Sequence, residues 1–304
     1  MKGNQLALPS LRQRAFIRLH FYLGYTMKLT VICPTYNHEK YIEKALIGFV
    51  EQITDFKFEV WVVDDASTDS TPEIITKYAQ LYPSIIKPIL REQNLGGRLS
   101  VNNAYLSVTS KYVLFCEGDD YLCCNTFLQD GVTFLDTHDD CIMFSANSLI
   151  HDLMRDTYRL VCSDTPSQWH SADEGKITYT HTSTRIFRYM PHILRGDMAS
   201  FVHTATLGRS YFKNEIVSVY NRTGDGMWSS LSRTDAHKQN MALFYALNKK
   251  FNYRYDHFIG KYIKYKKIWK ILRMILPPKL FWEIYFSLCR YSKDVELECR
   301  NEIA

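Results

Sequence analysis

Residues 29–37, Leu29-Thr30-Val31-Ile32-Cys33-Pro34-Thr35-Tyr36-Asn37, decide the fold, because a short apolar run rich in β-branched residues stops at a proline. This run predicts a buried strand that ends in a polar loop. A helix should follow with Asn37 as its N-cap, since apolar residues from Ile42 to Val50 recur at helical spacing. Strand, loop and amphipathic helix together open a βαβ arrangement.

The same arrangement recurs downstream. Strands are predicted at 58–63, 85–90 and 112–116, and each ends in a polar loop. Ser70 and Glu73 have the spacing of a capping box for the helix that follows the second strand. Four such alternations predict an α/β protein with a mostly parallel sheet and helices on both faces. The polar loops then meet at the carboxyl edge of the sheet, where open α/β sheets bind ligands.

Composition excludes several classes of protein. Of the 304 residues 46% are hydrophobic and 23% are charged, as in globular domains, so a disordered or fibrous chain is excluded. Lys, Arg or His interrupts every long apolar run, so no membrane-spanning helix of roughly 20 apolar residues is expected. Arg18 and His20 break the one candidate signal sequence. The eight cysteines form no C-x-x-C pair, and we expect neither a zinc site nor disulfides in a cytoplasmic protein.

Charge is concentrated at the two ends of the chain. The first 26 residues carry four basic and no acidic side chains, and residues 257–290 carry eight basic side chains against one acid. The body between them is mildly acidic, which argues against nucleic acid as a partner. Residues 265–276 form a basic amphipathic pattern that predicts contact with an anionic membrane surface on the cytoplasmic side. The alternative is that this helix packs on the body and shows its lysines to water.

Two acidic loops carry the chemistry. Asp64 and Asp65 follow the second strand, where they could bind a base or ribose, or simply organise the loop. Residues 117–120, Glu-Gly-Asp-Asp, place three carboxylates directly after a buried strand, where they repel one another unless they share a cation. Such oxygen-rich sites suit Mg²⁺ or Mn²⁺, with phosphates of a substrate completing the shell. An exposed acidic turn without a ligand is the alternative.

Taken together, the loops at 34–37, 63–69, 94–97 and 117–120 resemble the bacterial family 2 glycosyltransferases, which have the GT-A fold. The order and spacing of the motifs match over about 27–228. The resemblance implies an inverting, metal-dependent transfer of a sugar from a nucleotide-diphosphate sugar, for which we expect UDP. By matching position it implies binding of the nucleotide by Pro34, Thr35, Tyr36, Asp65 and Glu117, and of the cation by Asp119, with Asp120 ranked below it.

Three later residues complete the predicted site. An inverting displacement needs a carboxylate that takes the proton from the acceptor hydroxyl, and Asp197, in a Gly-Asp pair, matches the family's base. A helix N-cap is its alternative role. Arg222 is expected to contact the diphosphate, and Trp228 to pack on the sugar. The segment 181–187 resembles the family's acceptor-side strand.

The resulting hypothesis is a glycosyltransferase that acts on a hydroxyl of a glycan or lipid-linked glycan in surface polysaccharide synthesis. We divide the chain into a basic extension (1–26), a GT-A domain (27–230, with a nucleotide-sugar half at 27–125 and an acceptor half at 126–230) and a basic-aromatic helical region (231–304). One alternative is a sugar-phosphate nucleotidyltransferase, although the loop after the first strand lacks the Gly-rich, basic phosphate loop of that class. Another is a non-catalytic sugar-nucleotide-binding or membrane scaffold protein.

Overall fold

The computed structural model describes residues 27–163, 165–171, 179–191, 203–204 and 206–223, with the single residues 242, 249 and 252. Three predicted features therefore lie outside the described residues: the basic extension at 1–26, the candidate residues Asp197 and Trp228, and the amphipathic helix at 265–276.

The described elements alternate between strands and helices in the first half and are mainly strands in the second. In chain order they are β1 (Leu29–Thr35), α2 (Ile42–Val50), β2 (Phe58–Asp64), α3 (Thr71–Leu81), β3 (Ile86–Leu90), α4 (Gly97–Leu106), β4 (Tyr112–Phe115), β5 (Tyr121–Leu122), α5 (Phe127–Thr137), β6 (Cys141–Asp152), β7 (Thr157–Leu160), β8 (Gln168–His170), the 3₁₀ helix η1 (Thr182–Thr184), β9 (Arg185–Arg188) and β10 (Arg209–Arg222).

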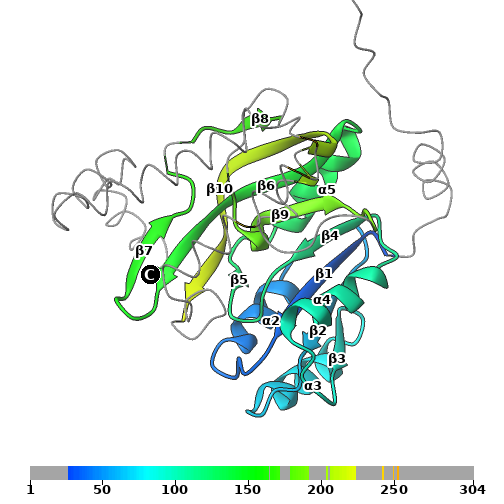
Figure 1. Cartoon of the computed structure of the whole chain (residues 1–304), viewed down its shortest axis with the longest axis vertical. Coiled ribbons are helices and arrows are strands. Elements are labelled where there is room, and N and C mark those ends of the chain that lie inside the picture. Colours follow the sequence, from blue (N-terminus) through cyan, green and yellow to red (C-terminus); the bar gives the residue numbers. More distant parts are fainter. Residues whose placement is uncertain are drawn as a thin grey trace, which may run out of the picture.

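The predicted parallel sheet is confirmed in the order β3-β2-β1-β4 (Figure 1). Helix α2 contacts α3, while α4 contacts β1 and β2. The crossovers from β1 to β2 and from β2 to β3 run one way along the sheet, and the crossover through α4 runs back. Because such connections are right-handed, α4 covers the face opposite to α2 and α3. The two faces are thus both covered, as expected for a parallel sheet.

The sheet continues past β4 as β9-β6-β10-β5, with β7 paired to β6 and β8 paired to β10. Strand β9 is antiparallel to both β4 and β6, whereas β6 and β10 are parallel to each other. Strand β10 was not predicted from the sequence, because polar residues interrupt its apolar pattern. Polar residues also interrupt β6: Asn147 is 1% exposed there, and its amide donates to the Cys162 carbonyl at 2.8 Å.

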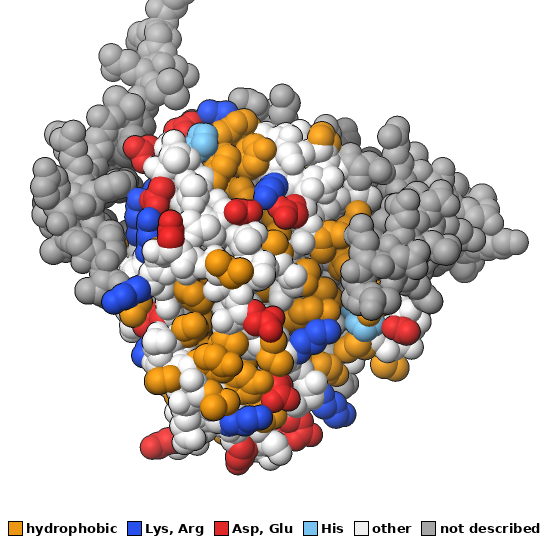
Figure 2. Space-filling model, turned by 180° about the vertical axis from the view of Figure 1, so that it is seen from behind, with side chains coloured by type: hydrophobic (Ala, Val, Ile, Leu, Met, Phe, Trp, Pro, Cys, Tyr) orange, Lys and Arg blue, Asp and Glu red, His pale blue; other side chains and the backbone are white. Residues whose placement is uncertain are grey.

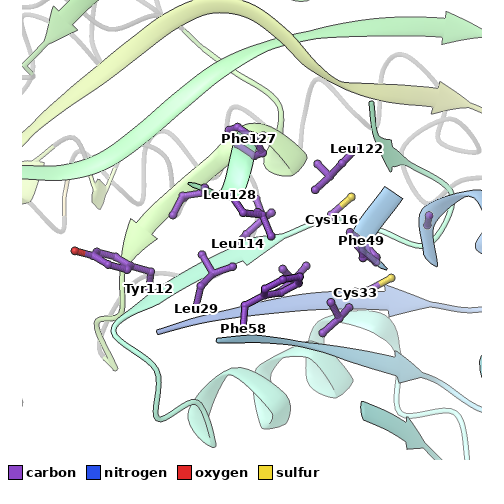
Figure 3. Close-up of a cluster of buried hydrophobic side chains, with 14 of the residues drawn as sticks. Leu29, Cys33, Phe49, Phe58, Tyr112, Leu114, Cys116, Leu122, Phe127 and Leu128 are labelled. Carbon is purple, nitrogen blue, oxygen red and sulfur yellow. The ribbon is translucent and has the colours of Figure 1, made fainter. Parts of the chain in front are cut away.

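The core lies between the sheet and α2 and α5, where apolar side chains from both halves meet (Figure 3). Phe49 of α2 and Leu128 of α5 are fully buried against Leu29 and Leu114 of the strands. In Figure 3, Cys33 and Cys116 stand toward the carboxyl ends of β1 and β4, and Tyr112 stands at the opposite end of β4. The six cysteines within the described residues are unpaired.

Two helix starts differ from the prediction. Helix α2 begins at Ile42 after Tyr41, so Asn37 is not its N-cap, and Asn37 instead takes a left-handed conformation with φ of 54°. Ser70 is the N-cap of α3, but its side chain makes no capping hydrogen bond. Asp69 accepts the Thr71 N–H at 3.0 Å in its place. In both loops the polar side chains serve the loop contacts described below.

The face of the molecule in Figure 2 carries Lys and Arg side chains interspersed with Asp and Glu. The described residues on this face therefore show no single basic patch of the kind that binds nucleic acid. Among the helices of the described residues, none has the length and hydropathy needed to cross a membrane.

Candidate active site

Polar loops from β1, β2 and β4 meet at the carboxyl edge of the parallel strands. Residues 35 and 64 are paired in register at the ends of β1 and β2. The Gly118 N–H donates to the Pro34 carbonyl at 2.9 Å, and the Asp65 N–H donates to the Thr35 carbonyl at 3.1 Å. These backbone hydrogen bonds bring Pro34, Thr35 and Asp65 together with the loop after β4, as the sequence predicted.

The loops after β1 and β2 are joined by reciprocal hydrogen bonds. The Asn37 N–H donates to the Ser67 hydroxyl at 2.8 Å, and the Asn37 side-chain oxygen accepts the Thr68 N–H at 2.8 Å. Likewise, the Asp69 carboxylate accepts the Glu39 N–H, and the Glu39 carboxylate accepts a backbone N–H from the loop that carries Asp69. The left-handed conformation of Asn37 is thus fixed by two contacts about 30 residues away in sequence. Because these hydrogen bonds hold the two loops together as one unit, the surface that the loops form is preorganised.

Asp64 and Asp65 are both buried, at 1% and 3% exposure, and face different neighbours. Asp64 accepts the Ser67 N–H and hydroxyl, so it organises its own loop. Asp65 accepts the Leu95 N–H at 3.0 Å, which ties the loop before α4 to the end of β2. The sequence left open whether these carboxylates bind ligand or organise the loop, and Asp64 takes the second role.

The acidic turn, residues 117–120, concentrates negative charge at the end of β4. Asp120 is 2% exposed, and burial together with the charges of Asp119 and Glu117 raises its pKa well above the ordinary value. Burial and the same acidic neighbours raise the pKa of the Cys33 and Cys116 thiols beneath the turn. Among the described residues, Asp119 and Asp120 form no ion pair with Lys or Arg. A divalent cation would relieve this uncompensated charge.

Two histidines lie near these carboxylates, and they differ in whether the ring nitrogen that faces the carboxylate has a hydrogen-bond partner. His181 Nδ1 lies 3.7 Å from Asp120 Oδ2 and is also hydrogen-bonded to the Ser183 hydroxyl at 2.8 Å. His38 Nδ1 lies 4.0 Å from Asp119 Oδ1 and is buried without a hydrogen-bond partner among the described residues. A buried orphan nitrogen calls for a partner such as water or an ion. This nitrogen without a partner lies on the side of the turn that bears Asp119.

The carboxylates of the acidic turn are suitable ligands for a cation that prefers oxygen. The described side chains alone do not complete the coordination shell of such a cation. Within the part of the chain that the structure describes, no three His, Cys, Asp or Glu side chains are placed to hold a metal by themselves. Mg²⁺ and Mn²⁺ are commonly held by one or two carboxylates plus substrate phosphates, so a carboxylate such as Asp119 beside an orphan nitrogen is sufficient chemistry.

Arg222 ends β10 one residue beyond Asn221, which contacts the acidic turn. Its guanidinium is 3.4 Å from Asp152 Oδ2 and its side chain is 41% exposed. Arg222 therefore has a carboxylate partner, which it would have to share to contact a diphosphate. Tyr36 is 44% exposed at the mouth of the first loop.

Sequence reasoning assigned no role at the turn to three residues from the second half of the chain: His181, Thr182 and Asn221. His181 lies near Asp120, Thr182 contacts Glu117, and Asn221 contacts both Asp119 and Asp120. A signal for Asn221 was present: Val217 and Val219 alternate as buried positions of β10, and the next position in that alternation is a buried polar residue. A polar side chain on an apolar strand face marks a specific partner.

The comparisons agree with this geometry. The family model described as "Glycosyl transferase family 2" matches residues 30–205. The chain belongs to glycosyl transferase family 2. An uncharacterized protein of Mycobacterium tuberculosis is 31% identical over 224 residues, which cover 69% of this chain and 63% of that relative. This family 2 chain thus spans less than two thirds of the length of that curated relative.

A shorter match and two solved structures are glycosyltransferases by name. The poly(ribitol-phosphate) beta-N-acetylglucosaminyltransferase TarS of Staphylococcus aureus is 41% identical over 116 residues, 37% of this chain and 19% of TarS. The structure of TarS 1–349 in complex with UDP-GlcNAc has a TM-score of 0.56 at 26% identity, covering 73% of this chain and 67% of that one.

The second structure is the mannosyltransferase PcManGT from Pyrobaculum calidifontis in complex with GDP-Man and Mn²⁺. Its TM-score is 0.53 at 17% identity, and the match covers 93% of this chain and 88% of that one. At this identity the likeness shows the fold alone. The GT-A fold predicted from the loop motifs is therefore confirmed by two structures.

Proposed function

We propose that this chain is an inverting, cation-dependent glycosyltransferase that transfers a sugar from a nucleotide-diphosphate sugar to a hydroxyl of a glycan or lipid-linked glycan acceptor in surface polysaccharide synthesis. The observation that carries the proposal is the acidic turn at the carboxyl edge, beside the loops of Pro34 and Asp65, in a chain of glycosyl transferase family 2. The relative TarS, which binds UDP-GlcNAc, supports UDP as the nucleotide.

The roles follow from position. Pro34, Thr35 and Tyr36 would border the base, Asp65 would hydrogen-bond it, and Glu117 would face the ribose or the cation. Asp119 would hold the cation, which would supply positive charge to balance the diphosphate. Asp120 is the more deeply buried of the two aspartates and already accepts the Asn221 N–H, so we assign it to support Asp119.

In the transfer step a bond forms between the acceptor oxygen and the anomeric carbon while the bond from that carbon to the diphosphate oxygen breaks. The acceptor proton goes to the carboxylate of Asp197, and the electron pair of the broken bond leaves with the diphosphate. Arg222 would release or share Asp152 to meet the diphosphate, and Trp228 would pack on the sugar. Attack from the face opposite the leaving group accounts for inversion.

A panel of UDP and GDP sugars, titrated with and without Mn²⁺ by calorimetry, tests the donor assignment. We expect at least one nucleotide sugar to bind only when Mn²⁺ is present. Asp119→Ala should abolish this Mn²⁺-dependent binding. Asp197→Asn should retain donor binding and lose transfer to glycan acceptors. Transfer at the wild-type rate by Asp197→Asn would remove the base assignment, and binding without turnover on any acceptor would favour a non-catalytic sugar-nucleotide-binding protein.

A further inference from the structure

Asn221 of β10 holds the acidic turn by two hydrogen bonds across about 100 residues of sequence. Its backbone N–H donates to Asp120 Oδ1 at 3.0 Å, and its side-chain amide donates to the Asp119 carbonyl at 2.6 Å. Any residue except proline can make the first contact, but the second needs an amide donor of this length. With 8% exposure, Asn221 makes both contacts largely shielded from water, where hydrogen bonds are stronger.

Thr182 holds the other end of the turn. Its hydroxyl donates to Glu117 Oε2 at 2.9 Å from the start of η1. The next residue, Ser183, is fully buried and its hydroxyl lies 2.8 Å from that of Ser218 in β10. Thr182 and Asn221 therefore act from one connected unit, formed by η1 and the end of β10.

The turn needs such external support because its own charges repel. Three carboxylates within four residues, one of them buried, favour any movement that separates them. The two donors counter this at both ends: one fixes the backbone that carries Asp119 and the other fixes the side chain of Glu117. Donors that orient metal-ligating carboxylates from behind commonly decide how tightly the metal binds.

We propose that Asn221 and Thr182 are positioning residues of the cation site, which set the affinity for the divalent cation by holding the acidic turn in its binding conformation. This inference rests on the proposed function of the turn. A purely structural role would instead lower the free energy of unfolding and leave cation affinity unchanged. The two roles are separated by measuring both quantities on the same variants.

The experiment titrates Mn²⁺ into the full chain with UDP, and separately with GDP, by calorimetry, and follows unfolding in urea. Asn221→Ala and Thr182→Val should each weaken Mn²⁺ binding about tenfold or more. Thr182→Ser, which restores the hydroxyl, should bind as the wild type does.

Asn147→Ala is the matched control. Asn147 is also a buried strand asparagine whose amide donates to a backbone carbonyl, at Cys162, away from the turn. It should lose stability while keeping wild-type Mn²⁺ affinity. Equal weakening by Asn147→Ala, or wild-type affinity in both Asn221→Ala and Thr182→Val, would overturn the inference.

Two further outcomes are decisive. If Asn221→Ala does not fold, the pair Thr182→Val and Thr182→Ser still decides the question, because each changes the side chain by one group. If the wild type binds neither nucleotide with Mn²⁺, the proposed function of the turn fails, and this inference fails with it. Wild-type affinity in the variants would refute only the positioning role, whereas absence of binding in the wild type would refute the proposed function. The two failures are therefore distinguishable.

Discussion

The carboxylates at the two ends of strands β1 and β4 differ in their neighbours and in the direction of their pKa shifts. At the carboxyl end, the acidic turn gathers three carboxylates, and burial beside Asp119 and Glu117 raises the pKa of Asp120. At the amino end, Asp136 of α5 lies 2.6 Å from both Lys28 Nζ and Lys111 Nζ. Burial alone would raise the pKa of Asp136, but the hydrogen bonds from Lys111 and Lys28 lower it to about 2.

Asp136 is thus paired with two lysines at the amino end, whereas Asp119 and Asp120 at the carboxyl end have no Lys or Arg partner within the described residues. We name Lys28, Lys111, Tyr112, Asp136 and Arg188 the foot cluster; Tyr112 donates to Asp136 at 2.7 Å and Arg188 lies 3.4 Å from the Tyr112 hydroxyl. A ligand that carries positive charge would complement Asp119 and Asp120, which have no Lys or Arg partner among the described residues.

The largest effect that separates the two ends is expected from Asp119→Asn. This change removes a carboxylate from the cation site, so Mn²⁺-dependent UDP binding should be lost and transfer should fall at least about 100-fold. Because it also relieves repulsion within the turn, the free energy of unfolding should stay equal or rise. Calorimetry and urea unfolding check the two parts. A marked loss of stability in Asp119→Asn would mean that the acidic turn is a structural charge cluster like the foot cluster.

A second titratable group lies toward the amino end of β10. His170 of β8 is paired with Ser210, is 2% exposed, and has neither ring nitrogen hydrogen-bonded within the described residues. Burial lowers the pKa of His170 to about 4. Since the folded value lies below the unfolded value of about 6.5, the stability contributed by neutral His170 is present above pH 6.5. It is lost as the pH falls toward 4, by up to about 3 kcal/mol.

Urea unfolding at pH 7.5 and pH 5 measures this loss. His170→Phe keeps an aromatic ring beside Phe212, on which His170 stacks at 6.0 Å, and has no proton to gain. The variant should therefore lose less stability between the two pH values than the wild type does. Equal losses in the two proteins would show that His170 does not titrate in this range and that carboxylates account for the acid sensitivity.

How much of the two ends was predictable follows from the range of the interactions. The acidic turn, the Asp65 loop and β1 to β4 were predicted, because each is encoded by neighbouring residues: an apolar run, then a polar loop. The support from Asn221 was not, since it reaches the turn from about 100 residues away. Asn37 was assigned to a helix cap for the same reason: its true partners, Ser67 and Thr68, lie in another loop.

Asp136→Asn tests the foot cluster directly. The asparagine keeps the shape of the side chain but leaves Lys28 and Lys111 without a carboxylate, so stability should fall by about 2 kcal/mol at pH 7. The contribution is present above the unfolded pKa of about 3.9 and is lost as the pH falls toward 2. Urea unfolding at pH 7 checks the loss, and Mn²⁺-dependent UDP binding should not change. Weaker Mn²⁺ binding in this variant would contradict the separation of the two ends.

The smallest effect is expected where charge at the amino end is paired but exposed. Arg209 Nη1 lies 2.9 Å from Asp140 Oδ2, with side chains 46% and 57% exposed, so Asp140→Asn should change stability by less than about 0.5 kcal/mol. Arg209→Ala should cost more than Asp140→Asn, because the Arg209 guanidinium also lies 4.0 Å from the centre of the Trp169 ring. Urea unfolding of both variants at pH 7 ranks them. If Asp140→Asn lowered stability as much as Asp136→Asn does, ion pairing alone would explain the stability supplied by the foot cluster. The partial burial of the foot cluster would then not be needed to explain it.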